Sequence, residues 1–351
     1  MKLRWGVIGC GGIAYRRTIP GMLLAENSEL VAVMDTCFDM AKKAQDEFGV
    51  QYAMDSVEEL LALDEVDAVY IATPVFCHKE QVMKAAAAKK HILLEKPMGL
   101  TVAESREIAA FCEAQGVKLG VGFMMRFNSL HERVRELIAN GDIGEIVSMR
   151  AQFTCWYPEI EGAWRQTKST SGGGALMDMG IHCIDILRFM SGLEAKEVTA
   201  LMGNQIFQYE VEDAASLLMQ MENGALVYVD AAFNIPDDAT ICKLEIYGTG
   251  GSVVLEGSLA QDETGEGALI VTGSDQGYNA QQNRTKAGSE ALKADGGNLY
   301  TKEVAAFAEA VLNRCAVPVT AEEAIRDQTV VEAAYQAAKT RQTVTLAATS
   351  F

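Results

Sequence analysis

The chain has 351 residues, 49% of them apolar, and a formal charge of −18 at pH 7. This length predicts two domains, and the apolar content is ordinary for a globular protein with a full hydrophobic core. A surface this acidic repels phosphate backbones and anionic lipids. We therefore exclude nucleic acid and membranes as expected partners and favour a small, neutral ligand.

The sequence also predicts a cytoplasmic protein without a bound metal. The N-terminus carries Arg4 within a short apolar run and leads directly into a glycine motif, which is not the pattern of a signal peptide. No apolar stretch reaches the ~18 residues of a membrane span. The eight cysteines form no C-x-x-C pair and the four histidines no H-E-x-x-H pair, so we expect reduced thiols and neither disulfides nor zinc.

Residues 1–122 alternate short apolar runs, typical of buried parallel strands, with longer helical segments. This order predicts an α/β domain with a doubly wound parallel sheet. The expected strands are Leu3–Ile8, Leu30–Asp35, Ala68–Ala72, Ile92–Glu95 and Leu119–Phe123. The expected helices are Ile13–Ala25, Met40–Phe48, Val57–Leu63, Lys79–Lys89 and Ala103–Gln115.

Residues 123–351 have a different pattern, in which strand-like runs are separated by turns of hairpin size. We predict an α+β domain with a mainly antiparallel sheet. The expected strands are Ile146–Phe153, Glu197–Gly203, Ala214–Met221, Ala225–Phe233, Lys243–Tyr247, Gly251–Glu256 and Leu269–Thr272. The expected helices are Leu130–Ala139, Leu176–Met190, Tyr300–Leu312 and Glu322–Thr340. The polar segment Gly273–Gly297 is expected to be a long functional loop.

A glycine-rich turn directly follows the first predicted strand. Gly9 permits a tight turn from strand to helix, Gly11 lets the backbone approach a pyrophosphate, and the small Ala14 lets the helix pack on the strand. Because the turn lies within a βαβ pattern, we predict that it binds a dinucleotide rather than forming a turn without a ligand. The cofactor-binding residues expected here are Gly9, Gly11, Gly12 and Ile13.

Asp35 ends the second predicted strand. A carboxylate at this place accepts a hydrogen bond from the ribose 2′-hydroxyl of NAD and repels the 2′-phosphate of NADP. No arginine follows within Thr36-Cys37-Phe38, so we predict NAD as the cofactor. The alternative is that Asp35 caps the following helix.

Two more strand ends carry polar groups at the edge of the sheet where a ligand is expected. Thr73 and Pro74 are expected to lie along the cofactor. His78 could contact it too, although a role at the start of a helix is the stronger expectation. Glu95 and Lys96 are expected at the nicotinamide, where the ammonium would polarise a substrate oxygen. The alternative for Lys96 is a surface pair with a glutamate.

Asp178 and His182 are spaced i, i+4 after the run Gly172-Gly173-Gly174, so a helix would place them on one face. Histidine can accept an alcohol proton near neutrality, and a carboxylate one turn away can orient it or hold a substrate hydroxyl. Asp185 could orient the histidine from the other side. Together with Lys96, these residues predict hydride chemistry on an alcohol. A structural histidine and a glycosidase pair of carboxylates are the alternatives.

Several segments closely resemble one family. GVIGCGGIA, VYIATP, EKP and GGGALMDMGIHCIDILRFMSG, with Asp35 at its strand end, are similar to the glucose–fructose oxidoreductase / inositol dehydrogenase (Gfo/Idh/MocA) family. The resemblance covers nearly the whole chain, and the joint occurrence of EKP and a D-x-G-x-H helix is highly specific. It implies a Rossmann domain over residues 1–122, then an α+β domain with a large open antiparallel sheet over residues 123–351. Such sheets often form the contact of a dimer or tetramer.

The resemblance also implies roles for individual residues. Lys96, Asp178 and His182 would form the catalytic set, and Arg126, Trp164 and Arg165 would line the cofactor and substrate cleft. One departure is Phe76, which stands where many members have a polar residue, often Asn. The loss of that residue puts one polar contact of the loop in doubt.

The resemblance leaves the substrate open among cyclitols, sugars, glycosides and dihydrodiols, and some members are redox-cycling glycosidases or NAD-binding regulators. The aromatic segment 153–164 suits the C–H face of a sugar ring or a flat aglycone. We therefore expect an NAD-dependent dehydrogenase acting on a ring hydroxyl, such as C3, of a glycoside rather than on inositol. The alternative for the aromatic residues is core at a domain interface. The expected substrate-binding residues are Lys96, Phe153, Trp156, Tyr157, Arg165, Asp178 and His182.

Overall fold

The computed structural model describes residues 1–272, 278, 280 and 288–347. The chain forms two compact units, each built from several segments. Unit 1 comprises Met1–Met124, Gly162–Gly172 and Asn298–Thr329, and unit 2 comprises Met125–Glu161, Gly173–Gly297 and Val330–Phe351. Unit 1 therefore includes two segments from the part of the chain that the sequence assigns to the second domain.

Unit 1 is built on a six-stranded parallel sheet with the order β3-β2-β1-β4-β5-β6. Its strands are β1 (Leu3–Ile8), β2 (Ser28–Met34), β3 (Tyr52–Met54), β4 (Ala68–Ile71), β5 (His91–Glu95) and β6 (Leu119–Gly122). The predicted doubly wound sheet is confirmed. The strand order reverses between β1 and β4, and in sheets of this kind the ligand crevice lies at the carboxyl ends of the strands at that point.

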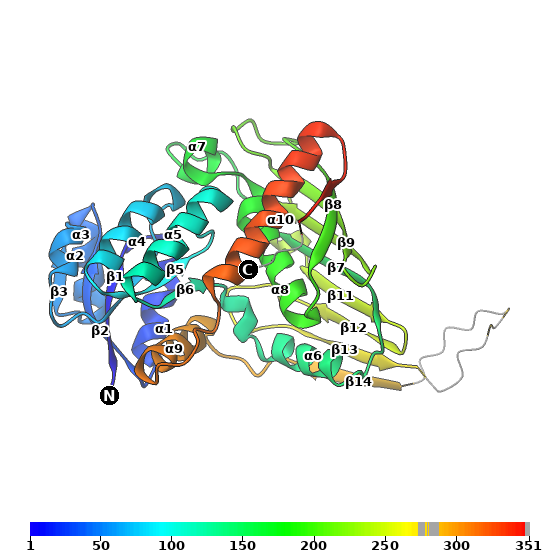
Figure 1. Cartoon of the computed structure of the whole chain (residues 1–351), viewed down its shortest axis with the longest axis horizontal. Coiled ribbons are helices and arrows are strands. Elements are labelled where there is room, and N and C mark those ends of the chain that lie inside the picture. Colours follow the sequence, from blue (N-terminus) through cyan, green and yellow to red (C-terminus); the bar gives the residue numbers. More distant parts are fainter. Residues whose placement is uncertain (273–277, 279, 281–287, 348–351) are drawn as a thin grey trace. The chain divides into compact units, whose positions relative to one another are not determined.

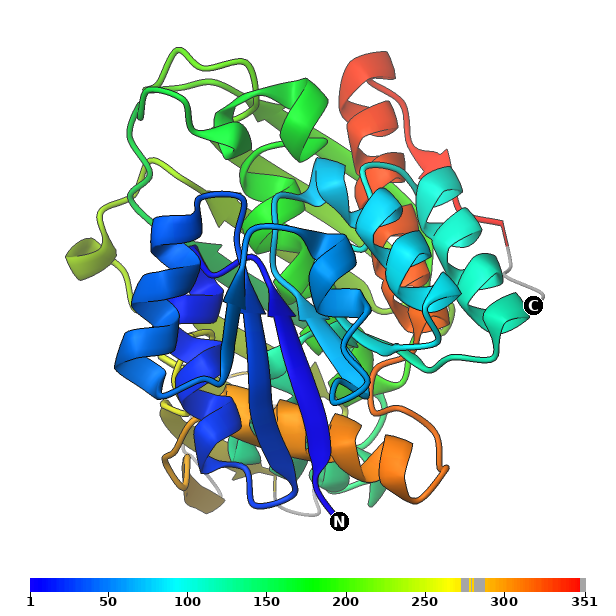
Figure 2. The ribbon, with the colours of Figure 1, turned by 90° about the vertical axis from the view of Figure 1, so that its left-hand side faces the viewer.

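Helices flank this sheet on its two sides (Figure 2). They are α1 (Ile19–Leu24), α2 (Phe38–Phe48), α3 (Val57–Leu61), α4 (His78–Ala87), α5 (Val102–Gln115) and α9 (Leu299–Leu312). α9 comes from late in the chain but packs on α1 and β1. The ring of Trp5 on β1 lies 5.4 Å from the ring of Phe307 on α9, and both side chains are fully buried.

Two details of unit 1 differ from the prediction. β3 was not expected, because its three half-buried residues are too few to form a recognisable apolar pattern. The single helix predicted over Ile13–Ala25 begins as a π-helical turn, η1 (Ala14–Thr18), and continues as α1. Pro20 lies in the first turn of α1 and has no N–H to bond the Arg16 carbonyl, so the preceding turn widens.

Unit 2 is built on a nine-stranded sheet with the order β14-β13-β12-β11-β7-β10-β9-β8-β15 (Figure 1). Its strands are β7 (Ile146–Thr154), β8 (Ala195–Gly203), β9 (Ala214–Met221), β10 (Leu226–Ala232), β11 (Lys243–Gly248), β12 (Gly251–Glu256), β13 (Glu266–Val271), β14 (Gly288–Lys293) and β15 (Val344–Thr345). Neighbouring strands are antiparallel except β7 and β10, which run parallel. The predicted, mainly antiparallel sheet is therefore confirmed.

One face of this sheet is covered by helices and the other carries exposed side chains. η5 (Leu176–Gly180) and α8 (Ile181–Ser191) pack on the central strands, and α6 (Ser129–Ala139) packs on α8. On β9, Leu217 is buried whereas its neighbour Leu218 is 46% exposed, because successive side chains of a strand point to opposite faces. The register places three more exposed side chains on the outer face with Leu218: Leu201, Leu226 and Tyr228.

The segment Gly273–Gly297, predicted to be a loop, contains a strand. Residues 288–293 form β14, which pairs with β13 at the edge of the sheet. Leu292 is the one buried side chain of this strand, so the sequence lacks the alternation of apolar residues that would indicate it. Residues 273–277, 279 and 281–287 lie outside the described residues.

The last long helix, α10 (Ala321–Thr340), begins one residue earlier than predicted. Its first turns belong to unit 1 and its last turns to unit 2. Among the residues that the structure describes, no helix combines the length and the apolar character needed to cross a membrane.

Candidate active site

The glycine turn after β1 is in close contact with the end of β4. Gly9 has a φ of +92°, and a Cβ placed on it would lie 2.9 Å from Thr73 Cγ2 and 3.0 Å from the carbonyl carbon of Ala72. Any larger residue would therefore separate the two strand ends. A Cβ on Gly11 or Gly12 would meet no described atom within 4 Å, so this side of the turn is open. A closely approaching pyrophosphate needs this combination.

Asp35 is bound to the same turn. Its Oδ2 accepts a hydrogen bond from the Cys10 N–H at 2.9 Å, and its Oδ1 accepts one from the Cys37 N–H at 3.0 Å. Cys37 directly precedes α2, so Asp35 also supports the start of that helix, which is the alternative role considered for it. A carboxylate has about four lone-pair positions, so acceptor capacity is left for a ribose hydroxyl.

His78 joins the turns that follow β4 and β5. It is the first residue of α4 and is buried, with Nε2 2.9 Å from the Thr73 carbonyl oxygen and Nδ1 3.0 Å from the Pro97 carbonyl oxygen. Burial lowers the pKa of His78 to about 4, although the carbonyl groups act in the opposite direction. This enclosed position favours the role at the start of the helix over direct contact with a cofactor.

The Glu95 carboxylate lies at the partly buried end of a hydrogen-bonded chain that the sequence did not predict. Tyr70 on β4 donates its hydroxyl proton to Glu95 Oε1 at 2.5 Å, and Thr18 on η1 donates to the Tyr70 hydroxyl at 2.9 Å. The Lys96 N–H donates to Glu95 Oε2 at 3.2 Å. Burial raises the pKa of Glu95, whereas Tyr70, Lys96 and Arg165 act in the opposite direction. Lys96 and Arg165 thus lie within electrostatic reach of one carboxylate.

Trp164 and Arg165 are far from the glycine turn in sequence but belong to unit 1. They lie in a short 3-10 helix, η4 (Trp164–Gln166), with the Arg165 guanidinium 4.4 Å from the Trp164 ring centroid. The next helix, α7 (Lys168–Ser171), contacts η2 (Val75–Cys77), the turn that follows β4. The fold therefore brings this segment to the strand-end turns of unit 1.

In unit 2, Asp178 and His182 lie on one continuous helical segment. Asp178 is in η5, a π-helical turn, and His182 is the second residue of α8. The helix predicted over Leu176–Met190 is present, but its first turn is wider than an α-helical turn. His182 is buried, and its ring lies 6.0 Å from the Phe153 ring, edge to face. π-Helical turns within helices are frequent at functional sites.

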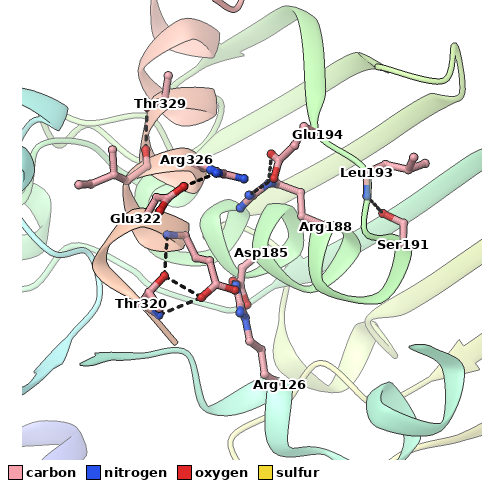
Figure 3. A network of polar contacts seen from close by, with 12 residues as sticks. Arg126, Asp185, Arg188, Ser191, Leu193, Glu194, Thr320, Glu322, Arg326 and Thr329 are labelled. Atoms are coloured by element: carbon pink, nitrogen blue, oxygen red, sulfur yellow. Dashed lines mark hydrogen bonds and ion pairs between the residues drawn. The ribbon is translucent and has the colours of Figure 1, made fainter. Parts of the chain in front are cut away.

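Arg126, expected to line the cofactor and substrate cleft, has a buried partner in unit 2. Its Nε and Nη2 donate to Asp185 Oδ1 at 2.9 and 2.6 Å (Figure 3). Both side chains are buried, and the guanidinium also lies 5.2 Å from the Phe189 ring centroid. This pairing favours a structural role for Asp185 over orienting His182. A contact between Arg126 and a cofactor stays a prediction.

The aromatic segment after β7 is part of a larger cluster. Phe153 and Tyr157 pack against a buried core cluster of unit 2, whereas Trp156 is 44% exposed. The Trp156 ring lies 5.1 Å from the Phe207 ring, which stacks on Tyr209 at 5.6 Å. The sequence did not mark Phe207 and Tyr209, because they lie in a polar loop that matches no motif.

A buried carboxylate that no motif marked lies at the start of the helix that carries Asp178. Glu212 accepts hydrogen bonds from the N–H groups of Gly174 and Leu176 and from the Tyr335 hydroxyl. These partners are far from Glu212 in sequence, so no local pattern indicates the contact.

The glycine turn and Asp35 fit a dinucleotide, because an open backbone turn and a carboxylate acceptor lie together at the ends of β1 and β2. A metal site has no comparable basis. In the described part of the chain, no group of three or more His, Cys, Asp or Glu side chains could hold a metal ion.

Two family models match the chain. Residues 3–123 match an oxidoreductase family with an NAD-binding Rossmann fold, and residues 131–254 match the GFO/IDH/MocA C-terminal domain.

Individual relatives extend this match over nearly the whole chain. The 1,5-anhydro-D-fructose reductase of Ensifer adhaerens is 30% identical over 340 residues, 97% of this chain and 97% of that protein. The glucose-6-phosphate 3-dehydrogenase of Bacillus subtilis (strain 168) is 30% identical over 254 residues, 69% of this chain and 71% of that protein. A crystal structure of a 3-ketoreductase from Actinomadura kijaniata with NADP and TDP-benzene has a TM-score of 0.82 at 25% identity, covering 96% of this chain and 98% of that one.

The buried, neutral His78 predicts a loss of stability in mild acid. Its pKa of about 4 lies below the ordinary 6.5, so its stabilising contribution is present above pH 6.5 and is lost as the pH falls toward 4. Between pH 7 and pH 5 this group alone should lower the free energy of unfolding by roughly 2 kcal/mol. Urea denaturation at fixed pH should show a shallower pH dependence for His78→Gln than for the wild type. Equal slopes for the two proteins would contradict the neutral, buried state.

Proposed function

This chain belongs to the Gfo/Idh/MocA family of oxidoreductases, and we propose that it is an NAD-dependent dehydrogenase that oxidises a ring secondary hydroxyl of a sugar or glycoside to a ketone. The family models cover residues 3–123 and 131–254, so the oxidoreductase class and the Rossmann fold apply to the chain itself. Two relatives are named for 1,5-anhydro-D-fructose and glucose 6-phosphate, which supports a sugar as the substrate class.

The observation that carries the proposal is the helix with Asp178 and His182. His182 is buried beside Phe153, with Asp178 one turn earlier on the same helical segment. Lys96 follows the end of β5, the kind of position at which sheets of this type bind ligands. A regulator that only binds NAD would need the glycine turn but would have no use for these three residues as a set.

In the proposed reaction the substrate alcohol loses a hydride from its carbon and a proton from its oxygen. NAD, when bound, supplies the hydride acceptor. His182 takes the hydroxyl proton, Lys96 stabilises the negative charge that develops on the oxygen, and Asp178 orients His182 or a second hydroxyl. General acid–base help of this kind contributes about 10²–10⁴ in rate.

For the substrate we propose a glucoside or related pyranoside that is oxidised at C3. The names of two relatives, a 3-dehydrogenase of glucose 6-phosphate and a 3-ketoreductase, support this position. Trp156 and Phe76 are 44% and 45% exposed, and aromatic faces of this kind suit the C–H face of a sugar or a flat aglycone. The net charge of −18 favours a neutral substrate over a phosphorylated one.

We also propose that the chain forms a homo-oligomer through the outer face of the nine-stranded sheet. Leu201, Leu218, Leu226 and Tyr228 are exposed on neighbouring strands of that face. Large apolar side chains exposed together on one face commonly mark a protein–protein contact. Light scattering should give a molar mass above that of one chain, and Leu218→Lys should lower it; a monomeric wild type would exclude this contact.

Substitution of the catalytic set tests the mechanism. Lys96→Ala and His182→Ala should each lower turnover by roughly 10²–10⁴, because each removes a group that acts on the reacting oxygen. NAD binding, measured by fluorescence titration, should be retained in both variants. Lys42→Ala, at an exposed position on α2, is the matched control and should turn over like the wild type. Unchanged turnover in both active-site variants would remove these residues from the mechanism.

Cofactor choice depends on Asp35. Asp35→Ala should raise the Kd for NAD by on the order of tenfold, because the acceptor for the ribose hydroxyl is lost. It should also reduce the preference for NAD over NADP, because the repulsion of the 2′-phosphate is lost. Asp39→Ala, in the first turn of α2, is the matched control. A wild-type protein that binds NADP more tightly than NAD would show that the NAD assignment is wrong.

The substrate class is tested by comparing kcat/KM for an aryl glucoside, glucose and myo-inositol. We expect the aryl glucoside to give the highest value and NADH to accumulate with the keto product. Release of the aglycone without net NADH would indicate a redox-cycling glycosidase instead. A clear preference for myo-inositol would exclude the glycoside and leave a cyclitol dehydrogenase.

A further inference from the structure

We propose that Glu212, held by Tyr335, is a positioning residue that fixes the start of the helix carrying Asp178 and His182 and so sets the geometry of proton transfer. The inference rests on the proposed function, because proton transfer by His182 is part of it. All four residues belong to unit 2.

Glu212 binds three successive N–H groups at the start of this helix. Its carboxylate oxygens accept from the Gly174 N–H at 3.0 and 3.1 Å, and Oε1 also accepts from the Leu176 N–H at 3.0 Å. The Glu212 backbone carbonyl accepts from the Ala175 N–H at 3.0 Å. The Tyr335 hydroxyl on α10 donates to Oε1 at 2.8 Å. The carboxylate is therefore fixed from two sides.

The glycine run before the helix is explained by this contact. A Cβ on Gly174 would lie 2.0 Å from the Glu212 carbonyl oxygen and 3.0 Å from its carbonyl carbon, so a larger residue would push the backbone of Glu212 away. A Cβ on Gly173 would lie 1.9 Å from the Tyr335 hydroxyl oxygen. The two glycines therefore permit the close approach of Glu212 and Tyr335 to the start of the helix.

The contact controls the first turn, in which Asp178 lies. The Asp178 N–H donates to the Gly174 carbonyl at 3.0 Å, so the residue that Glu212 holds also begins the hydrogen bonding of the helix. The first N–H groups of a helix have no partner within it, and negative charge is favoured beside them. Burial raises the pKa of Glu212, whereas the hydrogen bonds from Tyr335 and the backbone act in the opposite direction.

The neighbouring carboxylate offers a matched comparison. Asp213 accepts hydrogen bonds from the N–H groups of Gln205, Ile206 and Phe207 at 2.8, 2.8 and 2.9 Å. It therefore orders the loop with the aromatic residues, not the helix with His182. Glu212 and Asp213 have the same chemistry and adjacent positions, but they hold different parts of unit 2.

The experiment compares Glu212→Gln, Tyr335→Phe and Asp213→Asn in the full-length protein. Glu212→Gln should lower kcat by about tenfold or more, because even a small displacement of His182 from its reacting position slows the chemical step. The KM for NAD should change little. With deuterium on the substrate carbon that gives up the hydride, the primary isotope effect on kcat should rise, because the slower chemical step then limits turnover more fully. Asp213→Asn should change the KM for the sugar more than kcat. A purely structural role would lower the melting temperature and the active fraction without changing the isotope effect.

A second measurement does not depend on activity. In protein labelled with ¹³C-histidine, the His182 ring resonance, assigned through His182→Asn, should shift in Glu212→Gln and not in Asp213→Asn. If the wild type oxidises no substrate, the proposed function fails while this readout still tests positioning. Should Glu212→Gln not fold, Tyr335→Phe keeps the carboxylate, removes one hydrogen bond and should give the same changes at smaller size. Unchanged isotope effects and His182 resonances in the folded variants would overturn the proposal.

Discussion

Buried backbone N–H and C=O groups need hydrogen-bond partners, and at several irregular segments of this protein the partners are side chains. Asp35 accepts from the Cys10 N–H of the glycine turn, and the neutral His78 ring can donate to one of the two turn carbonyl oxygens that lie beside its nitrogens. Glu212 accepts from the start of the helix that carries His182. These contacts keep irregular segments in one conformation. Binding and catalytic groups on irregular segments need such a fixed backbone.

Three carboxyl groups, those of Glu95, Glu212 and Asp213, show how an acidic chain uses charge inside the fold. Burial raises the pKa of Glu95 and of Glu212. Against the effect of burial, the N–H groups of the loop that contains Phe207 hold the pKa of Asp213 below its ordinary value. Each group bonds within its own unit, so part of the formal charge counted from the sequence serves the fold and not the surface.

The sequence predicted what depends on local pattern and missed what depends on distant contacts. The bounds of β1, β9 and β12 were predicted to the residue, because their apolar runs end at turn residues. β14 was missed, because an edge strand with one buried side chain shows no alternation. Gly9 and His182 lie in short motifs and could be named from the sequence. Glu212 and Tyr335 are hydrogen-bonded although 123 positions separate them in the chain, and no periodicity in the sequence indicates such a contact.

The composition of unit 1 has a consequence for the order in which the protein is made. Its first 124 residues supply every strand of the parallel sheet, yet Phe307 of α9 packs on Trp5 of β1. During synthesis the ribosome adds about 5–20 residues per second, so the sheet emerges many seconds before α9 does. Over that interval the face of β1 that α9 later covers remains open to water and to other chains. That apolar face of the nascent Rossmann sheet is therefore accessible to chaperones until α9, close to the end of the chain, has been made.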